Sequence, residues 1–248
     1  MYRDLQVAVV VPAHNEARLL PTTLAGLPAW VDHVVVVDDA STDGTGGVVR
    51  RGGRVEVIRH PVNKGVGGAI VTGYRRAMAL GVDAVVVVGA DAQMDPTEMW
   101  SLLEPLAHDE ADYVKGNRLG HAEVVQRMPW VRLLGNHALS RLTRWITGYT
   151  DLMDAQCGYT ALRTSVLHQL PLAQLYPRYG FPNDLLARLS EVDARVVGRA
   201  VTPIYADETS GIRVPRVVLP ITWILARALG RRVARGLRRA PVVAVSNG

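Results

Sequence analysis

The sequence is poor in cysteine: Cys157 is the one cysteine among 248 residues. A single thiol cannot form a disulfide within the chain or supply a cysteine-rich zinc site, so disulfide-stapled secreted domains and zinc-finger modules are excluded. The scarcity fits a reducing compartment such as the cytoplasm. We interpret Cys157 as a small apolar packing residue, because no histidine neighbours it in the sequence to activate it as a nucleophile.

Long apolar runs are also lacking. No uninterrupted apolar stretch is long enough to cross a bilayer. The first residues, MYRDLQVAVVVP, lack the basic region, apolar core and small-residue cleavage site of a secretory signal. We therefore expect no export signal and a cytoplasmic protein. The formal net charge of +5 is concentrated near the end of the chain, and we expect no nucleic acid among the partners.

Several motifs of other enzyme classes are absent. The glycine run at residues 65–69 is not the G-x-G-x-x-G dinucleotide fingerprint, and Lys64 lacks the G-x-x-x-x-G-K-[ST] context of a Walker phosphate loop. No G-x-S-x-G elbow indicates a serine hydrolase, and none of the seven histidines forms an H-E-x-x-H pair. The histidines are predicted to be surface or packing residues, except His14, which lies in the first strand-end loop.

What the sequence does contain is a series of short apolar runs that end in polar turns. The β-branched runs predict strands buried on both faces. They lie at residues 7–11, 34–37, 55–58 and 85–88. A helix is predicted to open at Asn15 or Glu16 and another near Gly68. The order strand, helix, strand, strand, helix, strand predicts a three-layer α/β domain with a mostly parallel sheet. With 48% hydrophobic and 21% charged residues, the chain can bury the core of one large or two small domains.

The turn after the fourth run is the main candidate for chemistry, because it carries Asp91 and Gln93. Ligands of open α/β sheets bind outside the carboxyl ends of the strands, so this turn is predicted to hold a ligand or a metal that binds one. Asp95 and Pro96 are predicted to begin the next helix, since aspartate caps free amides and proline suits the first helical position. The second run likewise ends in an acidic turn, DDASTDGT.

Four motifs occur in the order PAHNE, VVDDASTDGT, NKGVGGA and GADAQMDP, and the series continues through KGNR, DAQCGYTALR and YGFPNDLL. Together they closely resemble the inverting family 2 glycosyltransferases of GT-A fold, in particular the branch around dolichol-phosphate mannose synthase and its bacterial polyprenyl-phosphate relatives. The likeness covers roughly residues 6–213. It implies a nucleotide-sugar donor, a divalent cation, Mg²⁺ or Mn²⁺, and inversion at the anomeric carbon.

The resemblance also implies which residues contact the donor. They are Pro12, His14, Glu16, Val37, Asp39, Lys64, Gly65, Ala90 and Asp91. Val37 and Asp39 match the positions that hold the nucleobase, where a carboxylate can accept from a base N–H. His14 stands where many relatives have tyrosine.

The metal and diphosphate site of the D-x-D-x-Q signature matches Asp91 and Gln93, but Gly89 replaces the first aspartate. One anionic ligand is therefore missing. Magnesium and manganese take oxygen ligands and share diphosphate oxygens and water with the protein, so Asp91, the Gln93 carbonyl and the donor form a chemically sound set. We expect weak affinity for free metal, and a relative that has lost catalysis is the alternative.

The acceptor is expected farther along the chain. Arg118 and Arg132 match positions that relatives use for the acceptor phosphate or the reacting diphosphate, and a guanidinium fork suits a phosphate. Asp184, at the start of a predicted helix, is either a cap or the general base that takes a proton from an attacking hydroxyl. The expected catalytic residues are Asp91 and Asp184. Three further arginines, of which the last two are predicted to lie on the surface, are Arg127, Arg141 and Arg144.

The last segment, from about residue 221 to 239, predicts an amphipathic helix with leucines on one side and arginines on the other. The apolar side contains Leu225, Leu229, Val233 and Leu237. The basic side contains Arg227, Arg231, Arg235 and Arg238. Such a helix is typical of attachment to anionic membranes, and docking on the catalytic domain is an equally open alternative. We divide the chain into a GT-A domain at 1–215 and a basic helix and tail at 216–248.

The sequence thus predicts a metal-dependent hexosyltransferase that uses a polyprenyl phosphate acceptor, located in the cytoplasm and peripherally on the inner face of the cell membrane. A soluble transferase that acts on a small-molecule or saccharide hydroxyl, with Asp184 as base, is the alternative enzyme. A non-catalytic protein that binds nucleotide sugars or serves as a scaffold is the alternative from another class.

Overall fold

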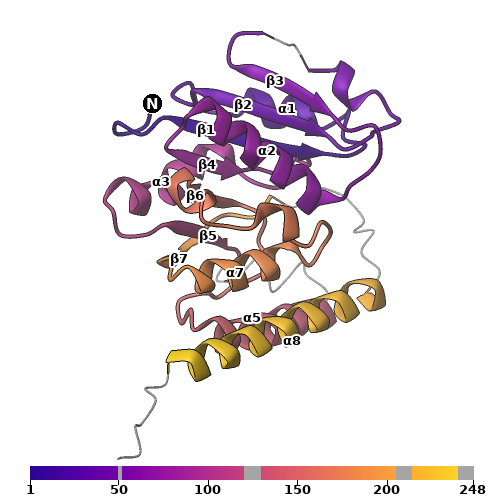
Figure 1. The fold of residues 1–248 in the computed structure, drawn as a ribbon. Coiled ribbons are helices and arrows are strands. Elements are labelled where there is room, and N and C mark those ends of the chain that lie inside the picture. The colour runs from indigo at the N-terminus through magenta and orange to yellow at the C-terminus, as the bar shows by residue number, and fades with distance from the viewer. Residues whose placement is uncertain (50–51, 120–129, 205–213, 240–248) are drawn as a thin grey trace, which may run out of the picture.

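The computed structural model describes residues 1–49, 52–119, 130–204 and 214–239. Within these residues a seven-stranded sheet forms the centre of the molecule (Figure 1). The strands are β1 (Val7–Ala13), β2 (His33–Asp38), β3 (Val55–Arg59), β4 (Ala84–Val87), β5 (Tyr113–Asn117), β6 (Thr160–Arg163) and β7 (Val196–Ala200). They lie in the order β3-β2-β1-β4-β6-β5-β7, and β6 alone among them runs antiparallel to its neighbours. The predicted mostly parallel sheet is confirmed, and the four expected strands are β1 to β4.

Helices cover both faces of the sheet, as the three-layer prediction requires. The helices are α1 (Leu20–Ala25), α2 (Val66–Leu80), α3 (Met99–Ala107), α5 (Trp130–Thr147), α6 (Thr164–Leu167), α7 (Phe181–Glu191) and α8 (Val214–Arg239). Short 3₁₀ turns are η1 (Thr45–Gly47), η2 (Pro96–Glu98) and η3 (Leu172–Gln174). One buried cluster joins α2, α6 and α7 to the sheet, and a second joins α1 and α3 to its other face.

Helix α2 packs closely on β1. Its residues Ile70, Tyr74 and Ala77 are buried against the sheet, and Met78 is half-buried. A Cβ atom at Gly73 would lie 2.2 Å from Cγ1 of Val10, so only glycine lets the helix backbone approach the strand this closely.

Helix α1 starts later than predicted. We expected a helix from Asn15 or Glu16, but α1 begins at Leu20. The reason is that the intervening amides are bonded to the loop after β2: Glu16 N donates to Thr45 Oγ1 at 2.9 Å, and Ala17 N donates to the Asp43 carboxylate at 3.0 Å. These contacts hold the segment as a loop.

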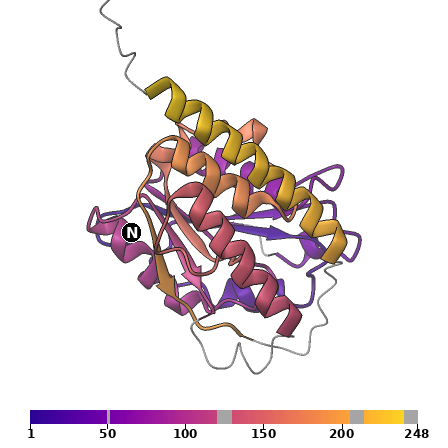
Figure 2. The same cartoon turned by 90° about the horizontal axis from the view of Figure 1, so that it is seen from below.

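Helices α5 and α8 run side by side at the base of the molecule, below α7 (Figures 1 and 2). Ile221, Leu225 and Ala228 of α8 are buried together with Ile146 of α5 and Ala187 of α7. Helix α8 therefore docks on the domain, and the proposed boundary at residues 215–216 falls within its first turn. No described helix combines the length and apolar character that a bilayer span requires.

Candidate functional site

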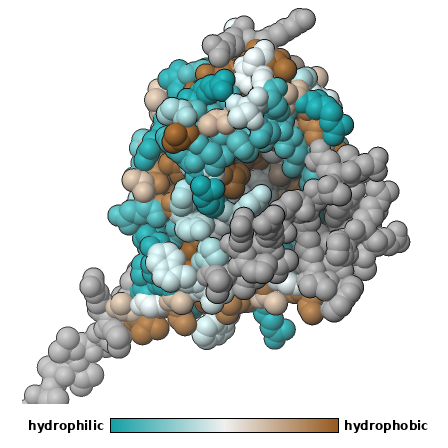
Figure 3. All heavy atoms as spheres, turned by 90° about the vertical axis from the view of Figure 1, so that its right-hand side faces the viewer, coloured by the Kyte–Doolittle hydropathy of each residue, from teal (hydrophilic) through white to brown (hydrophobic). Residues whose placement is uncertain are grey.

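The loops after β1, β2 and β4 each hold one non-glycine residue with a left-handed backbone. These residues are Asn15, Ala40 and Ala92, with φ of 59°, 58° and 54°. Such conformations cost of order 1 kcal/mol or more and cluster at functional sites. Because β1 lies between β2 and β4 and all three are parallel, the loops share one edge of the sheet. Hydrophilic side chains gather over the upper part of this side of the molecule (Figure 3).

Asp39 joins the loops that follow β1, β2 and β3. Its buried carboxylate accepts from the backbone amides of Lys64 and Gly65 at 2.8 and 2.7 Å. Asp39 Oδ1 also lies 2.7 Å from Nδ1 of the buried His60, and the Asp39 carbonyl oxygen lies 2.9 Å from Nδ1 of His14. The structure thus gathers the predicted donor-binding residues His14, Lys64 and Gly65 around Asp39.

This network changes the expected use of Asp39. We expected its carboxylate to accept from a base N–H, but the chain itself already fills three of its roughly four lone-pair positions. The base contact stays a prediction, whereas the anchoring of the 60–65 loop is observed. His60, held on its other side by Thr72 Oγ1 at 2.9 Å, was missed from the sequence. Its place just after a strand was the signal that could have found it.

The other predicted donor residues lie at the same edge with different exposure. Val37 and Ala90 are buried, Pro12 and Glu16 are half-buried, and His14 and Lys64 are exposed.

The glycine run in the 60–69 segment serves packing. Gly65 has φ of 86°, and a Cβ atom there would lie 2.6 Å from the carbonyl oxygen of Pro177. A Cβ atom at Gly67 would lie 2.6 Å from the Tyr176 carbonyl oxygen and 2.8 Å from the Phe181 side chain. These two glycines therefore let the chain pack closely on the 176–181 segment, which leads into α7.

The turn after β4 holds Asp91, which is half-buried. Asp91 Oδ1 accepts from the backbone N–H of Gln93 at 3.1 Å. Two contacts fix the turn. Ala92 N donates to Thr23 Oγ1 at 3.2 Å, and the backbone carbonyl of Gln93 accepts from Ile204 N at 3.0 Å. The predicted cap at Asp95 is confirmed behind this turn, where its side chain accepts from the following 3₁₀ turn.

The donor set of this turn fits a hard cation that is shared with a diphosphate. Asp91 offers a carboxylate, and the exposed Gln93 offers its side-chain carbonyl oxygen. Magnesium and manganese prefer oxygen donors of this kind. Across the described ranges, no group of three or more acidic, histidine or cysteine side chains could hold a metal alone. A Cβ atom at position 89 would lie 2.8 Å from Asp91 Oδ1, so a side chain there would crowd the carboxylate. Gly89 keeps this space beside Asp91 open.

Arg118 follows β5 and pairs with a carboxylate that the sequence analysis did not single out. Its Nε and Nη2 atoms donate to the two carboxylate oxygens of Asp154 at 2.8 and 3.3 Å. Asp154 is 1% exposed. Burial alone would raise the pKa of the Asp154 carboxyl, but the adjoining Arg118 outweighs it and the pKa is lowered, so this is an ionised pair. The quoted DAQCGYTALR motif, which opens with Asp154, was the available signal.

The loop that carries Asp154 touches the turn that carries Asp91. A Cβ atom at Gly158 would lie 3.1 Å from Cε of Met94, and the Tyr159 hydroxyl donates to the Asp95 carbonyl at 3.0 Å. The loop that holds the partner carboxylate of Arg118 thus borders the turn that carries the predicted diphosphate site.

Asp184 is closed off from solvent. It is fully buried on α7, where Oδ2 accepts from Tyr176 N at 2.9 Å and Oδ1 lies 3.3 Å from Nη2 of Arg227. Nη2 of Arg231 lies 3.7 Å from the same oxygen. The expected outward basic face of α8 is therefore wrong for Arg227 and Arg231, because both turn inward to this buried carboxylate.

Other predictions fall partly outside the described residues. Arg127 lies outside them, as do the side chains of Arg132, Arg235, Leu237 and Arg238. Arg141 is exposed on α5, as expected. Cys157 is buried, which raises the pKa of its thiol and agrees with a packing role.

Comparison with known proteins places this geometry in a family. The profile described as Glycosyl transferase family 2 matches residues 8–170. The chain is 31% identical over 246 residues to the undecaprenyl-phosphate mannosyltransferase of Micrococcus luteus, covering 94% of this chain and 100% of the relative. It is 30% identical over 184 residues to the UDP-N-acetylglucosamine–dolichyl-phosphate N-acetylglucosaminyltransferase of Methanococcus voltae, covering 67% of this chain and 73% of the relative.

Solved structures share the fold at lower identity. The glucosyl-3-phosphoglycerate synthase of Mycobacterium tuberculosis in complex with UDP matches with a TM-score of 0.70 and 22% identity, over 92% of this chain and 81% of that one. Its complex with Mn²⁺, UDP and glucosyl-3-phosphoglycerate matches with a TM-score of 0.66 and 21% identity, over the same shares of both chains. The GT-A architecture expected from the sequence is confirmed.

Proposed function

Because the chain belongs to glycosyl transferase family 2, we propose that it transfers a sugar from a nucleotide-sugar donor to a polyprenyl phosphate, with inversion at the anomeric carbon. Relatives whose names state a polyprenyl or dolichyl phosphate acceptor support this acceptor.

The burial of Asp184 is the observation that favours a phosphate over a hydroxyl acceptor. A hydroxyl nucleophile needs a base within hydrogen-bond reach, and Asp184 instead accepts from Tyr176 N beneath the arginines of α8. A phosphate is already anionic and needs no such base. It needs a cation, and Arg118 is held in a fixed orientation by the Asp154 carboxylate, on a loop that borders the Asp91 turn.

The proposed reaction is a single displacement. An oxygen of the acceptor phosphate forms a bond to the anomeric carbon while the bond from that carbon to the donor diphosphate breaks, and its electron pair leaves with the nucleoside diphosphate. Arg118 orients the acceptor phosphate for this attack. The Asp39 network fixes the loops that receive the nucleoside.

Asp91 and Gln93 would hold a divalent cation together with the donor diphosphate. That cation supplies positive charge against the charge that develops on the leaving group. Because Gly89 stands at the first position of the signature, we propose that metal binds well only with nucleotide present.

The outward surface of α5 and α8 supports contact with the membrane in which a polyprenyl acceptor resides. Among the side chains that the structure describes, the large exposed apolar residues on these helices are Leu134, Leu142, Trp145, Trp223 and Val233. Pale and brown side chains line the lower border of the molecule (Figure 3). Exposed Arg141 and Arg232 add positive charge that complements anionic lipid.

A transfer assay tests the proposal directly. The protein is incubated with undecaprenyl phosphate in detergent and with each of UDP-glucose, UDP-N-acetylglucosamine and GDP-mannose, with Mn²⁺ or with a chelator. We expect one donor to give a sugar product that partitions into organic solvent, and we expect the chelator to suppress it. Product that stays in the aqueous phase would support the hydroxyl-acceptor alternative, and no turnover of any donor would support a binding protein.

A further inference from the structure

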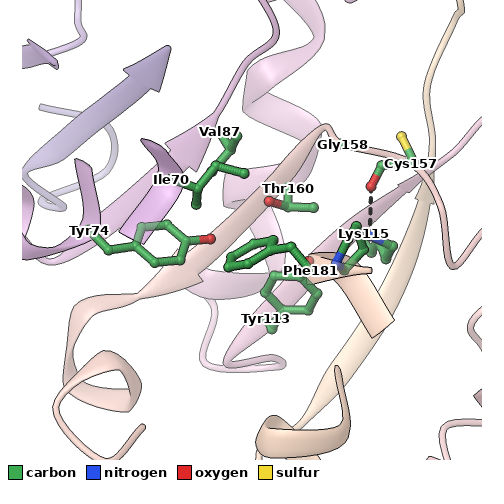
Figure 4. Close-up of a pocket in the computed structure, with 10 residues that line it drawn as sticks. Ile70, Tyr74, Val87, Tyr113, Lys115, Cys157, Gly158, Thr160 and Phe181 are labelled. Carbon is green, nitrogen blue, oxygen red and sulfur yellow. Dashed lines mark hydrogen bonds between the residues drawn. The ribbon is translucent and has the colours of Figure 1, made fainter. Parts of the chain in front are cut away.

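Lys115 is buried under the loop that carries Asp154, although a lysine is an unfavourable residue to bury. It is 1% exposed, and its Nζ donates to the Cys157 carbonyl at 2.6 Å (Figure 4). It forms no ion pair within the part of the chain that the structure describes. A buried ammonium without an ion pair is destabilising by several kcal/mol, and the Tyr113 ring, whose centroid lies 6.0 Å from Nζ, offsets only part of that cost; an apolar side chain of similar volume would not carry it.

The surroundings of Lys115 are mostly apolar. It lines a small pocket together with Ile70 and Tyr74 of α2, Val87 at the end of β4, and Phe181 at the start of α7. A methionine would suit these neighbours better than an ammonium group. The chain keeps a charge at a place where packing alone favours an apolar residue, and this points to a use for the charge.

The charge acts on the pair that we assign to the acceptor. Asp154 and Arg118 both interact electrostatically with Lys115. Arg118 and Asp154 alone form a neutral pair, because the carboxylate cancels the guanidinium. Lys115 brings the cluster of Lys115, Asp154 and Arg118 to a net charge of +1. Its hydrogen bond to Cys157 also fixes the turn in which the Asp154 carbonyl accepts from Cys157 N at 3.4 Å.

We propose that Lys115 is a positioning residue whose buried charge makes the Arg118–Asp154 pair attractive to the acceptor phosphate. The proposal rests on the proposed function, since it assumes that Arg118 receives that phosphate. Lys115 does not touch the acceptor. It acts through the 154–157 turn and through the electrostatic potential at Arg118.

The proton on Lys115 gives the proposal a signature in pH. Burial lowers the pKa of Lys115 from 10.5 to about 8. Among the groups that face it, burial raises the pKa of Tyr74, Tyr113 and Cys157, and the pKa of Asp154 is lowered. Between pH 7 and 9.5 Lys115 is therefore the member of this group expected to lose charge, and affinity for an anion at Arg118 should fall above about pH 8.

The test measures binding of farnesyl phosphate by calorimetry between pH 7 and 9.5. Lys115→Met removes both the charge and the hydrogen bond, and Lys115→Gln removes the charge but keeps a donor for Cys157. Tyr74→Phe is the control in the same pocket, because it leaves the 154–157 turn untouched. At pH 7 we expect both Lys115 variants to bind about tenfold more weakly than wild type, the order expected for one nearby unit charge, and to lose the pH dependence. Tyr74→Phe should match wild type.

A folding measurement accompanies the binding test. Between about pH 8 and 10.5 Lys115 holds its proton in the unfolded chain but loses it in the folded one, so wild type should gain unfolding free energy with rising pH relative to Lys115→Met, in which the other groups are the same. Chemical denaturation of both proteins across this range checks it. An equal pH dependence would show that Lys115 does not carry the buried charge, and would overturn the proposal.

Binding outcomes separate this proposal from the proposed function. Equal affinity of wild type and both Lys115 variants for farnesyl phosphate would overturn the role of Lys115 and leave the acceptor standing. Weakening in Lys115→Met alone would overturn the role of the charge. Lys115-dependent binding of inorganic pyrophosphate without binding of farnesyl phosphate would keep the charged cluster and contradict the acceptor. Wild type that binds neither anion would overturn both.

Discussion

The Asp91 carboxylate lies at the end of β4, and its replacement by asparagine removes a negative charge while keeping the shape of the side chain. We expect Asp91→Asn to abolish transfer, because removing one electrostatic interaction with the reacting groups typically raises the barrier by about 3 kcal/mol or more. Steady-state turnover with the active donor checks this.

Asp95→Asn is the matched control for Asp91→Asn. Asp95 caps η2 in the same turn, and asparagine caps about as well as aspartate. This variant should keep turnover and stability near wild type. Near-normal turnover in Asp91→Asn would count against the metal and diphosphate assignment.

Replacement of Asp184 distinguishes a structural role of this residue from a role as the general base. Asp184→Asn removes the carboxylate that pairs with Arg227 and one of the two carboxylates that Arg231 contacts, the other being Glu191, and breaking a buried ion pair costs about 3 to 5 kcal/mol. We expect a large loss of unfolding free energy in urea but little change in kcat for the folded protein. A general base would show the reverse, with a roughly 100-fold to 10,000-fold loss of rate.

Arg118→Ala should instead raise KM for the acceptor.

Docking of helix α8 on the catalytic domain was one of two open alternatives, and the structure shows the helix docked. A chain that ends at residue 213 would expose Ile146 and Ala187 and leave Asp184 uncompensated. We expect this truncation to lower the unfolding free energy by several kcal/mol, since removing the packing around one large buried apolar side chain costs about 2 kcal/mol or more. Removal of residues 240–248 alone is the control. Urea midpoints that agree between all three chains would contradict the docking of α8.

The strands and the cap at Asp95 could be predicted from the sequence because they depend on local patterns. Four β-branched runs predicted β1 to β4, and the Asp95-Pro96 pair predicted a helix start. The features that could not be predicted depend on residues whose partners lie far along the chain. The start of α1 is set by side chains of the β2 loop, the glycines at 65 and 67 pack on the 176–181 segment, and Arg227 turns inward to Asp184. Helical periodicity alone could not distinguish an arginine that faces lipid from one that faces a buried carboxylate.

The exposed Trp145 and Trp223 belong to helices α5 and α8, which run side by side at the base of the molecule (Figures 1 and 2). We expect sedimentation with anionic vesicles at low salt and release as salt rises, because the charged contribution is on the order of 1 kcal/mol per arginine and is screened. The double variant Trp145→Ser and Trp223→Ser should bind more weakly while keeping its thermal stability, since both side chains are exposed.

Trp100→Ser is the control for this experiment, because Trp100 is also exposed but lies on α3. Wild type that stays in the supernatant with anionic vesicles at low salt would refute membrane contact. Equal weakening by Trp100→Ser would place the contact elsewhere on the surface.

The antiparallel strand β6 has a consequence for how the chain reaches its native state during synthesis. Strands β1 to β4 pair with one another using only residues up to Val87. Within the described sheet, strand β5 pairs only with β6 and β7, and β6 lies roughly 40 residues farther along the chain. Ribosomes add about 5 to 20 residues per second, so β6 is synthesised some seconds after β5. During that interval the apolar edges of β4 and β5 have no permanent neighbour. A pause in translation after β5 would therefore lengthen the period in which the nascent chain is open to aggregation or to chaperone binding.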